Sequence, residues 1–289
     1  MPLLMPEGAR APERLLIYGG PGVGKSSCWI DIAQKMEEYR SPGKVYVLDT
    51  DNAVEAMFGA GYAHLEERVV WFPCYDWPSL TKAQKEVMET RPTIDDWVVI
   101  DMMSFPYTEI RRYYTEMVYG QNLEEYLLET ARLINMAKAA KEAGDKSSRS
   151  EREFGDWSGR DWDHMNKIYL AWEVPLTLRM PANVVAVAEE REVDSARGAS
   201  ADQVKRYKRA GSHKPYVNKT AEHRFRTVIR VTNPGSSREL VLAKDRYREE
   251  VWDETASRGI IDLGDMHEDG GFVRRYLVDI AGWRLRRRG

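Results

Sequence analysis

The sequence predicts an α/β protein in which a mostly parallel central sheet is flanked by helices. Strand-like runs alternate with helix-like runs along the chain, which is typical of a parallel sheet. Near the start, the apolar run Leu15–Tyr18 leads into a glycine-rich loop, and the loop leads into the helix-like stretch Ser27–Met36. Two later apolar runs flank the turn-forming residues Asn233–Ser236, which predicts an antiparallel hairpin near the C-terminal end.

Each further element follows from the spacing of its apolar residues. The candidate strands, in chain order, are Leu15–Tyr18, Val45–Leu48, Val69–Phe72, Trp97–Ile100, Asn183–Ala188, Arg226–Val231 and Leu240–Lys244. Helical spacing predicts helices through Leu80–Met88, Leu123–Ala137 and Trp162–Leu176. Pro175 is expected to bend the end of the last one.

No convincing linker divides the chain, so we expect one elaborated domain. Residues 1–13 are expected to be a loose N-terminal segment and residues 14–250 the domain itself. Residues 251–289 are expected to form a helical, basic tail packed on the same domain. Polar loops are predicted at 141–160 and at about 191–220.

Composition excludes several classes of protein. The 289 residues carry 43 Lys and Arg against 46 Asp and Glu, so the net charge of −3 gives no indication of a nucleic-acid partner. No apolar run approaches about 18 residues, which predicts no membrane span. Two cysteines do not make a disulfide framework. We therefore expect a cytoplasmic protein with no membrane partner.

The glycine-rich loop at residues 19–26 (the glycine loop) reads GGPGVGKS and fits the phosphate-binding pattern G-x-x-x-x-G-K-[ST] without a mismatch. Its glycines allow successive backbone N–H groups to turn toward a polyphosphate, and the helix N-terminus adds partial positive charge. Lys25 is predicted to reach the β- and γ-phosphates of a nucleoside triphosphate, and the Ser26 hydroxyl to ligate Mg²⁺. The predicted nucleotide contacts are Gly19, Gly20, Pro21, Gly22, Val23, Gly24, Lys25, Ser26 and Ser27.

Two of the later strands end in carboxylates. Asp101 follows the fourth strand, where a protein of this kind needs a carboxylate to hold Mg²⁺ directly or through a water. Asp49 and Asp51 follow the second strand, and one of them could polarise an attacking water. The alternative is that Asp51 or Asn52 caps the helix-like stretch that comes next.

In this order the motifs resemble those of the RecA-like P-loop ATPases. The matching phrases are GPGVGKSS (20–27), YVLDTDNA (46–53), WVVID (97–101), NVVAVAEER (183–191) and LVLAKDRYR (240–248). The chain most resembles the small phage and prophage members that act as single-strand DNA annealing or recombination ATPases. The resemblance extends over about residues 14–250.

The resemblance implies roles for several residues. Asp51 stands in place of the family's catalytic Glu, one methylene shorter, and Asp101 matches the Asp that holds the metal. Lys244 and Arg246 match a Lys-x-Arg pair that reaches the nucleotide of a neighbouring subunit, so the protein is expected to form a homo-oligomeric ring or filament. The alternative for this pair is a solvated strand end.

A basic stretch follows the fifth strand, where RecA-like proteins place the loop that lines the DNA channel. Between residues 191 and 226 there are ten Lys or Arg against four Asp or Glu, with aromatic rings interleaved. Such a pattern suits single-stranded DNA, and the alternative is a solvated, mobile loop. The candidate DNA contacts are Lys205, Arg206, Tyr207, Lys208, Arg209, Lys214 and Lys219.

The sequence thus predicts a Mg-ATP-dependent, DNA-stimulated ATPase that binds single-stranded DNA and assists annealing or recombination. A single-strand-binding protein is a further expected partner, and a phage-encoded protein would act in the cytoplasm of its bacterial host. One alternative is a small-molecule or nucleotide kinase, with Arg111, Arg112 or the 141–160 loop in a lid. Another is a helicase-like or loader motor.

Overall fold

The computed structural model describes residues 4–5, 11–144, 159–193, 199–235, 237–255, 259–264 and 270–285. Contacts divide the chain into two compact units. The core unit contains Met1–Phe105 and Val174–Gly289, and the helical unit contains Pro106–Glu173. Within the described ranges, no helix is both long and apolar enough to cross a bilayer.

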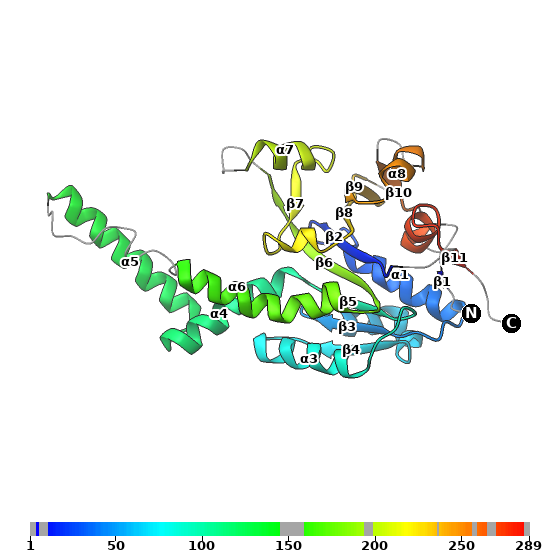
Figure 1. Ribbon diagram of the computed structural model, residues 1–289, viewed down its shortest axis with the longest axis horizontal. Helices are drawn as coiled ribbons and strands as arrows, with labels where there is room; N and C mark the ends of the chain where they lie inside the picture. Colours follow the sequence, from blue (N-terminus) through cyan, green and yellow to red (C-terminus); the bar gives the residue numbers. More distant parts are fainter. Residues whose placement is uncertain are drawn as a thin grey trace. The chain divides into compact units, whose positions relative to one another are not determined.

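A nine-stranded sheet forms the centre of the described part of the core unit (Figure 1). Its strands are β2 (Arg14–Gly19), β3 (Val45–Asp49), β4 (Val69–Pro73), β5 (Trp97–Asp101), β6 (Asn183–Glu192), β7 (His213–Pro215), β8 (Thr227–Thr232), β9 (Glu239–Asp245) and β10 (Ile260–Asp262). In space the order is β10-β9-β8-β2-β6-β5-β3-β4, and β7 pairs with β6. Strands β8, β2, β6, β5, β3 and β4 run parallel, whereas β9 is antiparallel to both β8 and β10. The predicted fold class, a mostly parallel sheet with a C-terminal antiparallel hairpin, is confirmed.

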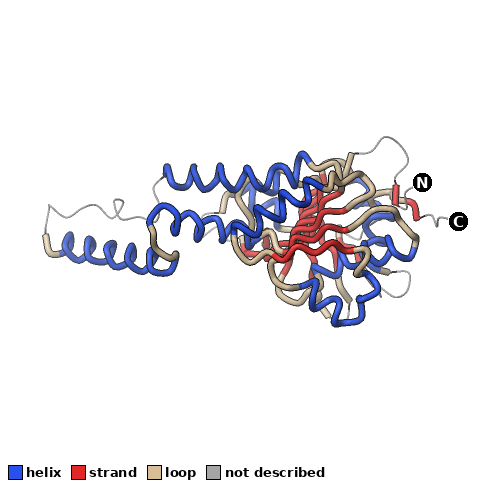
Figure 2. The backbone as a smooth tube through the Cα atoms, turned by 90° about the horizontal axis from the view of Figure 1, so that it is seen from below, coloured by secondary structure: helices blue, strands red, loops and turns tan. Residues whose placement is uncertain are grey.

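Within the core unit, helices lie around the sheet, with the strands in the interior (Figure 2). Those of the core unit are α1 (Lys25–Glu38), α2 (Ala53–Met57), α3 (Trp77–Glu89), α7 (Ala201–Tyr207) and α8 (Glu249–Thr255), with the shorter turns η1 (Phe58–Tyr62), η2 (Ala63–Leu65), η4 (Pro175–Arg179), η6 (Ala221–His223) and η7 (Val273–Val278). Because side chains alternate along a strand, Leu15 and Ile17 face the same side of the sheet, where they pack in one cluster with Trp29 and Ile32 of α1. Fully burying a side chain of this size contributes about 1.5–3 kcal/mol, so this cluster holds α1, and with it the end of the glycine loop, against β2.

Two short strands, one near each end of the chain, form where the sequence predicted a loose segment and a helical tail. The backbone of β1 (Leu4–Met5) pairs antiparallel with β11 (Arg284–Leu285), which places a strand where a helical tail was expected. Between residues 251 and 289, the described residues are helical only in α8 and η7, and β10 extends the central sheet. In β10 and β11, hydrogen bonds to a paired strand satisfy backbone N–H and C=O groups. The arginines at 286–288 lie outside the described residues.

The helical unit contains α4 (from Ser104 to Tyr119, shared with the core unit), α5 (Leu123–Glu142) and α6 (Gly159–Val174). Helix α6 ends where the predicted bend begins, and η4 continues from Pro175. The hydroxyls of Tyr114 and Tyr119 donate to the two carboxylate oxygens of Asp161 at 2.8 and 3.1 Å, which ties α4 to α6.

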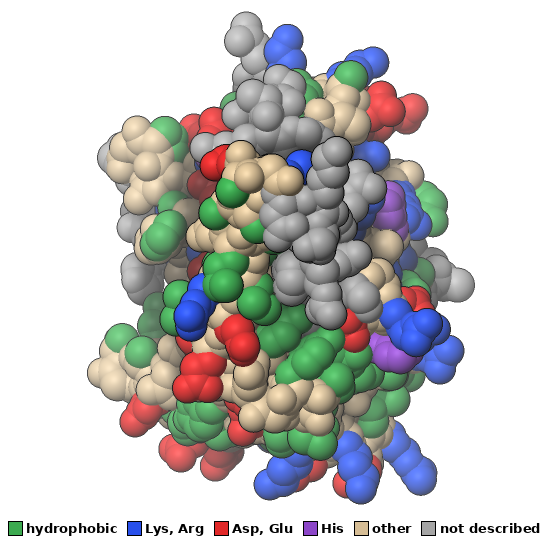
Figure 3. Space-filling view, turned by 90° about the vertical axis from the view of Figure 1, so that its left-hand side faces the viewer, with side chains coloured by type: hydrophobic (Ala, Val, Ile, Leu, Met, Phe, Trp, Pro, Cys, Tyr) green, Lys and Arg blue, Asp and Glu red, His purple; other side chains and the backbone are tan. Residues whose placement is uncertain are grey.

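The arginines proposed for a kinase lid are engaged inside the helical unit. Arg112 bonds the carboxylates of Glu109 and Glu124, both at 3.0 Å. The Arg111 guanidinium lies 5.8 Å from the centre of the Tyr107 ring. Residues 145–158 of the predicted 141–160 loop lie outside the described residues. Acidic, basic and apolar side chains are all visible among the described residues in Figure 3.

A buried carboxylate joins α1 to the C-terminal segment. Asp31 is 1% exposed, and its Oδ2 accepts the Val273 N–H of η7 at 2.7 Å. Burial raises the pKa of Asp31 from 3.8 to about 6, against the lowering effects of the Val273 N–H and of Lys35. Between these two pH values the folded protein binds a proton at Asp31 that the unfolded chain does not bind, so stability increases as the pH falls.

We expect the free energy of unfolding to gain about 1.4 kcal/mol from Asp31 between about pH 8 and about pH 5. Asp31→Asn should lack this gain because an amide does not titrate in this range. Urea unfolding of both proteins across that range measures the difference. Glu86→Gln, which changes a carboxylate that is 44% exposed on α3, is the control and should keep the wild-type pH dependence. Parallel pH curves for wild type and Asp31→Asn would contradict the prediction.

Candidate functional site

The register of the parallel strands brings the predicted site residues to one edge of the sheet. Gly19 at the end of β2 pairs with Glu189 of β6, and Asp101 at the end of β5 pairs with Val187 of β6. Asp49 at the end of β3 pairs with Asp101. The glycine loop and the carboxylates of the second and fourth predicted strands are therefore neighbours, although long helical segments separate them in sequence.

The backbone of the glycine loop needs glycine at two of its positions. At Gly24 the chain has φ of 93°, the left-handed region that L side chains rarely adopt. At Gly19 an added Cβ would lie 2.4 Å from the carbonyl oxygen of Val231 on β8. Gly24 directly precedes α1 and supplies no side-chain cap. The first N–H groups of the helix therefore receive no side chain of Gly24 as acceptor, and they can donate to a bound anion.

Lys25 is 8% exposed, and its Nζ donates to the carbonyl oxygen of Gly20 at 2.7 Å, across the loop. Burial lowers the pKa of Lys25, while the carboxylates of Asp101, Glu189, Glu190 and Asp51 raise it. The ammonium group is thus held in a desolvated position in the loop, where a phosphate oxygen could take the place of the Gly20 carbonyl.

Asp101 is fully buried and keeps one oxygen without a conventional donor. Its Oδ2 accepts the indole N–H of Trp29 at 2.8 Å, whereas Oδ1 has no hydrogen-bond partner. Burial raises the pKa of Asp101, and the nearby Trp29 N–H and Ser26 hydroxyl lower it. Trp29 was not among the predicted site residues, although it lies one helical turn beyond Lys25.

This arrangement fits Mg²⁺ in the way that nucleotide-binding proteins hold it. A buried carboxylate oxygen without a donor lies beside the Ser26 hydroxyl, and Mg²⁺ takes one or two such ligands together with phosphate oxygens and waters. The described residues contain no group of three or more His, Cys, Asp or Glu side chains that could hold a metal by themselves. Asp101 and Ser26 would hold the ion together with the nucleotide.

Asp49, rather than Asp51 or Asn52, is the residue whose side chain holds the start of α2. Its two oxygens accept the N–H groups of Ala53 and Val54, each at 3.0 Å. Asn52 adopts φ of 63° and makes no side-chain cap. Desolvation is the largest effect on Asp51 and raises its pKa to about 7, with further raising effects from Asp101 and Asp49. The Asp51 carboxyl lies in the carboxylate cluster with Asp49 and Asp101, and the Ala53 N–H at the start of α2 lowers its pKa in turn.

An ion pair that the sequence did not predict flanks the other side of the loop. Arg230 of β8 donates to both oxygens of Glu190, at 2.7 and 3.1 Å, and to the carbonyl of Ala210 at 3.0 Å. A cavity of about 450 Å³ adjoins this pair, a volume in the range of small-molecule sites. It is lined by Gly20 and Val23 of the loop, by 209–211, by Glu190 and Arg230, and by 231–234 and Val241.

The basic stretch after β6 is partly folded, where a continuous polar loop was expected. Strand β6 extends to Glu192, and β7 pairs with its end. Helix α7 begins with a capping box, in which the Ser200 side chain accepts the Gln203 N–H and Gln203 reaches back. Arg197 lies outside the described residues.

The candidate DNA contacts differ in accessibility. The exposed ones are Lys205, Arg206, Lys208, Arg209 and Lys219. Lys214 is half-buried, and burial lowers its pKa. Tyr207 is 2% exposed and its hydroxyl donates to Glu222, so its ring packs inside and is not presented to a base. An aromatic ring that stands nearer the surface is Tyr216, with the Arg191 guanidinium 5.4 Å from its centre.

Lys244 and Arg246 lie near the end of β9 and are held by carbonyls of their own chain. The Lys244 ammonium donates to the carbonyls of Glu222 and Phe225 at 2.6 and 2.9 Å, and burial lowers its pKa to about 8. Arg246 is exposed and donates to the carbonyl of His223. Arg246 is therefore the more accessible cation of the two.

The edge of the sheet that carries this pair is opposite to the edge that carries the glycine loop. Antiparallel pairing sets Asp245 opposite Thr227, and Thr227 pairs with Leu15 near the start of β2. The loop begins at Gly19, four residues beyond Leu15 on β2, which corresponds to about 13 Å along the strand. Across the sheet, β2 is also two strands away from β9. The pair is thus too distant to touch a phosphate held at the loop of its own chain.

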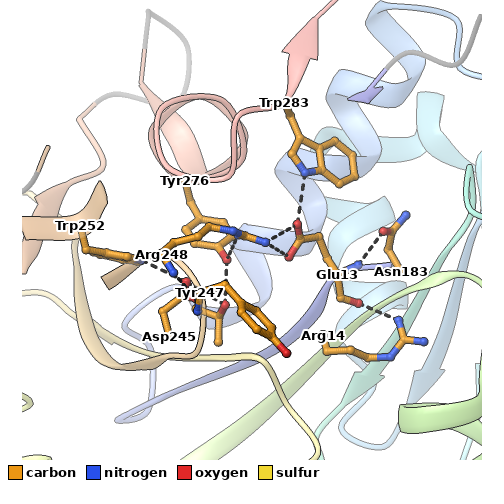
Figure 4. Close-up of polar contacts among 10 residues, drawn as sticks. Glu13, Arg14, Asn183, Asp245, Tyr247, Arg248, Trp252, Tyr276 and Trp283 are labelled. Carbon is orange, nitrogen blue, oxygen red and sulfur yellow. Dashed lines mark hydrogen bonds and ion pairs between the residues drawn. The ribbon is translucent and has the colours of Figure 1, made fainter. Parts of the chain in front are cut away.

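Buried hydrogen bonds fix the residue between the two cations (Figure 4). Asp245 is 5% exposed and accepts the Thr227 hydroxyl at 3.0 Å and the Trp252 indole N–H at 3.3 Å. The backbone on either side of Asp245, and hence the base of each cationic side chain, is held by the folded core.

The same network continues into an ion pair between distant parts of the chain (Figure 4). Arg248 donates to both oxygens of Glu13 at 2.7 and 2.9 Å and to the Tyr276 hydroxyl at 2.9 Å. Trp283 adds an indole N–H to Glu13 at 3.4 Å. Residues from the start, the hairpin and the C-terminal segment thereby share one buried polar cluster.

No protein-family profile matches the chain, and no curated protein sequence is significantly similar to it. Among solved structures, the crystal structure of the RadB recombinase is 14% identical, with a TM-score of 0.44 over 88% of this chain and 92% of that chain. The crystal structure of the KaiC-like protein PH0186 from the hyperthermophilic archaeon Pyrococcus horikoshii OT3 is 16% identical, with a TM-score of 0.38 over 89% and 92%. At this level of identity and superposition, neither likeness carries an argument about what this chain does.

Proposed function

We propose that the chain is a RecA-like ATPase that binds Mg-ATP at the glycine loop. The observation that supports this most strongly is the buried Asp101, whose Oδ1 has no donor, at the same sheet edge as the loop. Lys25 would contact the phosphates, and Ser26 and Asp101 would hold Mg²⁺ with the phosphate oxygens. Asp51, at the same carboxylate cluster, would orient the attacking water.

Single-stranded DNA is the partner that we propose for the basic stretch. Exposed cations gather on and after α7, and the carbonyl of Ala210 in this stretch is bonded by Arg230 beside the glycine loop. Cations that track phosphates give salt-dependent binding without base preference. The Arg191–Tyr216 contact offers a ring for a base at the start of this stretch.

An oligomer is the third part of the proposal. Because Lys244 and Arg246 are too distant from their own glycine loop, they would act at the nucleotide of a neighbouring copy in a ring or filament. In this form the protein would assist annealing or recombination, with a single-strand-binding protein as a further partner. We place it among phage or prophage proteins that act in the bacterial cytoplasm.

ATP turnover with and without single-stranded DNA tests the proposal. We expect DNA to stimulate turnover, and Lys205→Gln/Lys208→Gln to make the dependence of DNA affinity on salt shallower by about 1.4 in logarithmic slope, since two phosphate contacts are lost. The matched control is Lys82→Gln/Lys85→Gln, two exposed lysines on α3, which should bind DNA like the wild type.

Three outcomes would redirect the assignment. Phosphorylation of a small molecule, with turnover indifferent to DNA, would identify a kinase. Unwinding of a forked duplex without annealing would identify a helicase-like motor. Equal DNA affinity of the Lys205→Gln/Lys208→Gln variant and its control would remove the basic stretch from the DNA site.

A further inference from the structure

The turn between β8 and β9 lies directly beside the glycine loop. The carbonyl oxygen of Val231, at the end of β8, is 2.4 Å from the position that a Cβ on Gly19 would occupy. Residues 231–234 share the cavity wall with Gly20 and Val23. The turn is therefore close enough to the loop for one of its side chains to contact it.

Arg238, the last residue before β9, makes such an approach. A Cβ added at Gly24 would lie 2.8 Å from the Arg238 Nε, 2.9 Å from its Cζ and 3.0 Å from its Cδ. The backbone of Arg238 is fixed, because its carbonyl accepts the Leu263 N–H at 2.8 Å and the next residue, Glu239, pairs with β10. The guanidinium group consequently lies against the last glycine before α1.

A cation at this position complements Lys25. Lys25 spans the loop toward Gly20, at its beginning, whereas Arg238 lies against Gly24, at its end. One ammonium group cannot neutralise a triphosphate, and a guanidinium group offers a planar fork of donors that matches two phosphate oxygens. In the phosphate-binding pattern that this loop fits, the backbone N–H groups surround the α- and β-phosphates, which ATP and ADP have in common.

We propose that Arg238 binds the α- or β-phosphate of a nucleotide held at the glycine loop of its own chain. This inference rests on the proposed nucleotide site and adds to it a residue from a turn more than two hundred positions away in sequence. Because ATP and ADP share these phosphates, Arg238 strengthens the binding of both and leaves the chemical step to other residues. A purely structural Arg238 would instead support the fold through its contact with Gly24.

Calorimetric titration with Mg-ATP and Mg-ADP separates these two roles. We expect Arg238→Gln to weaken both nucleotides about tenfold or more, as loss of a charge-assisted bond does, with kcat little changed and KM raised. Arg238→Lys, which keeps the charge but not the fork, should lie between wild type and Arg238→Gln. Arg274→Gln, a half-exposed arginine of η7, is the control and should bind like the wild type.

The outcomes that overturn the inference are distinct. ATP and ADP affinities of Arg238→Gln within about twofold of wild type, or a loss confined to ATP, would rule out contact with the shared phosphates. A fall in melting temperature in both Arg238 variants, with Arg238→Lys losing as much affinity as Arg238→Gln, would show a structural role. If the wild type binds neither nucleotide, the proposed function itself fails; if it binds both and Arg238→Gln does too, only this inference fails.

Discussion

Lys25→Ala is expected to lower the affinity for Mg-ATP by more than about 100-fold, to below the limit of calorimetric detection. In the structure the ammonium group donates to the Gly20 carbonyl inside the loop, in a position where burial already disfavours its charge. A polyphosphate would supply two charged acceptors in place of one neutral carbonyl, and each charge-assisted bond is worth about 1.5–3 kcal/mol. Alanine removes both bonds and leaves the carboxylates around the loop facing the phosphates.

The matched control for this variant is Lys35→Ala on the same helix. Lys35 is partly exposed and pairs with Glu38, away from the loop, so its removal should leave ATP affinity unchanged. Both variants should keep the wild-type melting temperature within a few degrees, because neither removes packed apolar surface. ATP binding by Lys25→Ala at near wild-type affinity would mean that the loop does not hold phosphates.

Arg246→Ala is expected to keep ATP binding and to lose turnover by a factor of about 10³ or more. Cations that reach the γ-phosphate from outside stabilise the charge that develops during phosphoryl transfer, and removing one typically costs this much. Because Arg246 lies at the edge of the sheet opposite its own loop, the loss should be repaired by a neighbour. A mixture of Arg246→Ala and Lys25→Ala subunits pairs an intact loop with an intact Arg246 and should recover part of the activity.

Turnover of the two variants, alone and mixed, gives the answer when it is measured across protein concentration. Arg274→Ala, which removes a half-exposed arginine of η7 that pairs with Asp279, is the control and should behave as wild type in the same mixtures. Failure of the mixture to exceed the sum of its parts, with both proteins folded and oligomeric, would rule out action across an interface. Full turnover by Arg246→Ala alone would show that the strand end is merely solvated.

Most of the sheet could be predicted from the sequence because its strands are buried on both faces. The run Leu15–Tyr18 predicted β2 to within one residue at each end, since a charged residue precedes it and the glycines follow. The stretch after β6 could not be assigned by composition, because polar residues are common both in loops and in short amphipathic helices. The Ser200–Gln203 capping box was nonetheless visible in the sequence and would have predicted the start of α7.

Some residues of the candidate site could be predicted from the sequence and others could not. The meeting of Gly19, Asp101 and Asp49 follows from the rule that parallel strands end at one edge, so sequence order alone predicted it. Trp29 could have been inferred, since residues one helical turn apart face the same way. Arg238 could not, because its contact depends on how the β8–β9 turn folds back over the loop, and no local pattern in the sequence records that path.

Strand β9 connects the arginine proposed to bind the nucleotide of its own subunit with the arginine proposed to act at the nucleotide of a neighbour. Glu239–Asp245 spans about 20 Å, with Arg238 before its first residue and Arg246 after its last. Hydrogen bonds join β9 to β8 from Glu239 to Asp245 and to β10 at Glu239–Val241, so we expect a displacement at one end of β9 to move the other. If both arginines contact phosphates as proposed, one strand connects the nucleotide of one subunit to that of the next. Loss of the γ-phosphate in one subunit would then be transmitted along the assembly mechanically, without any change in the strand itself.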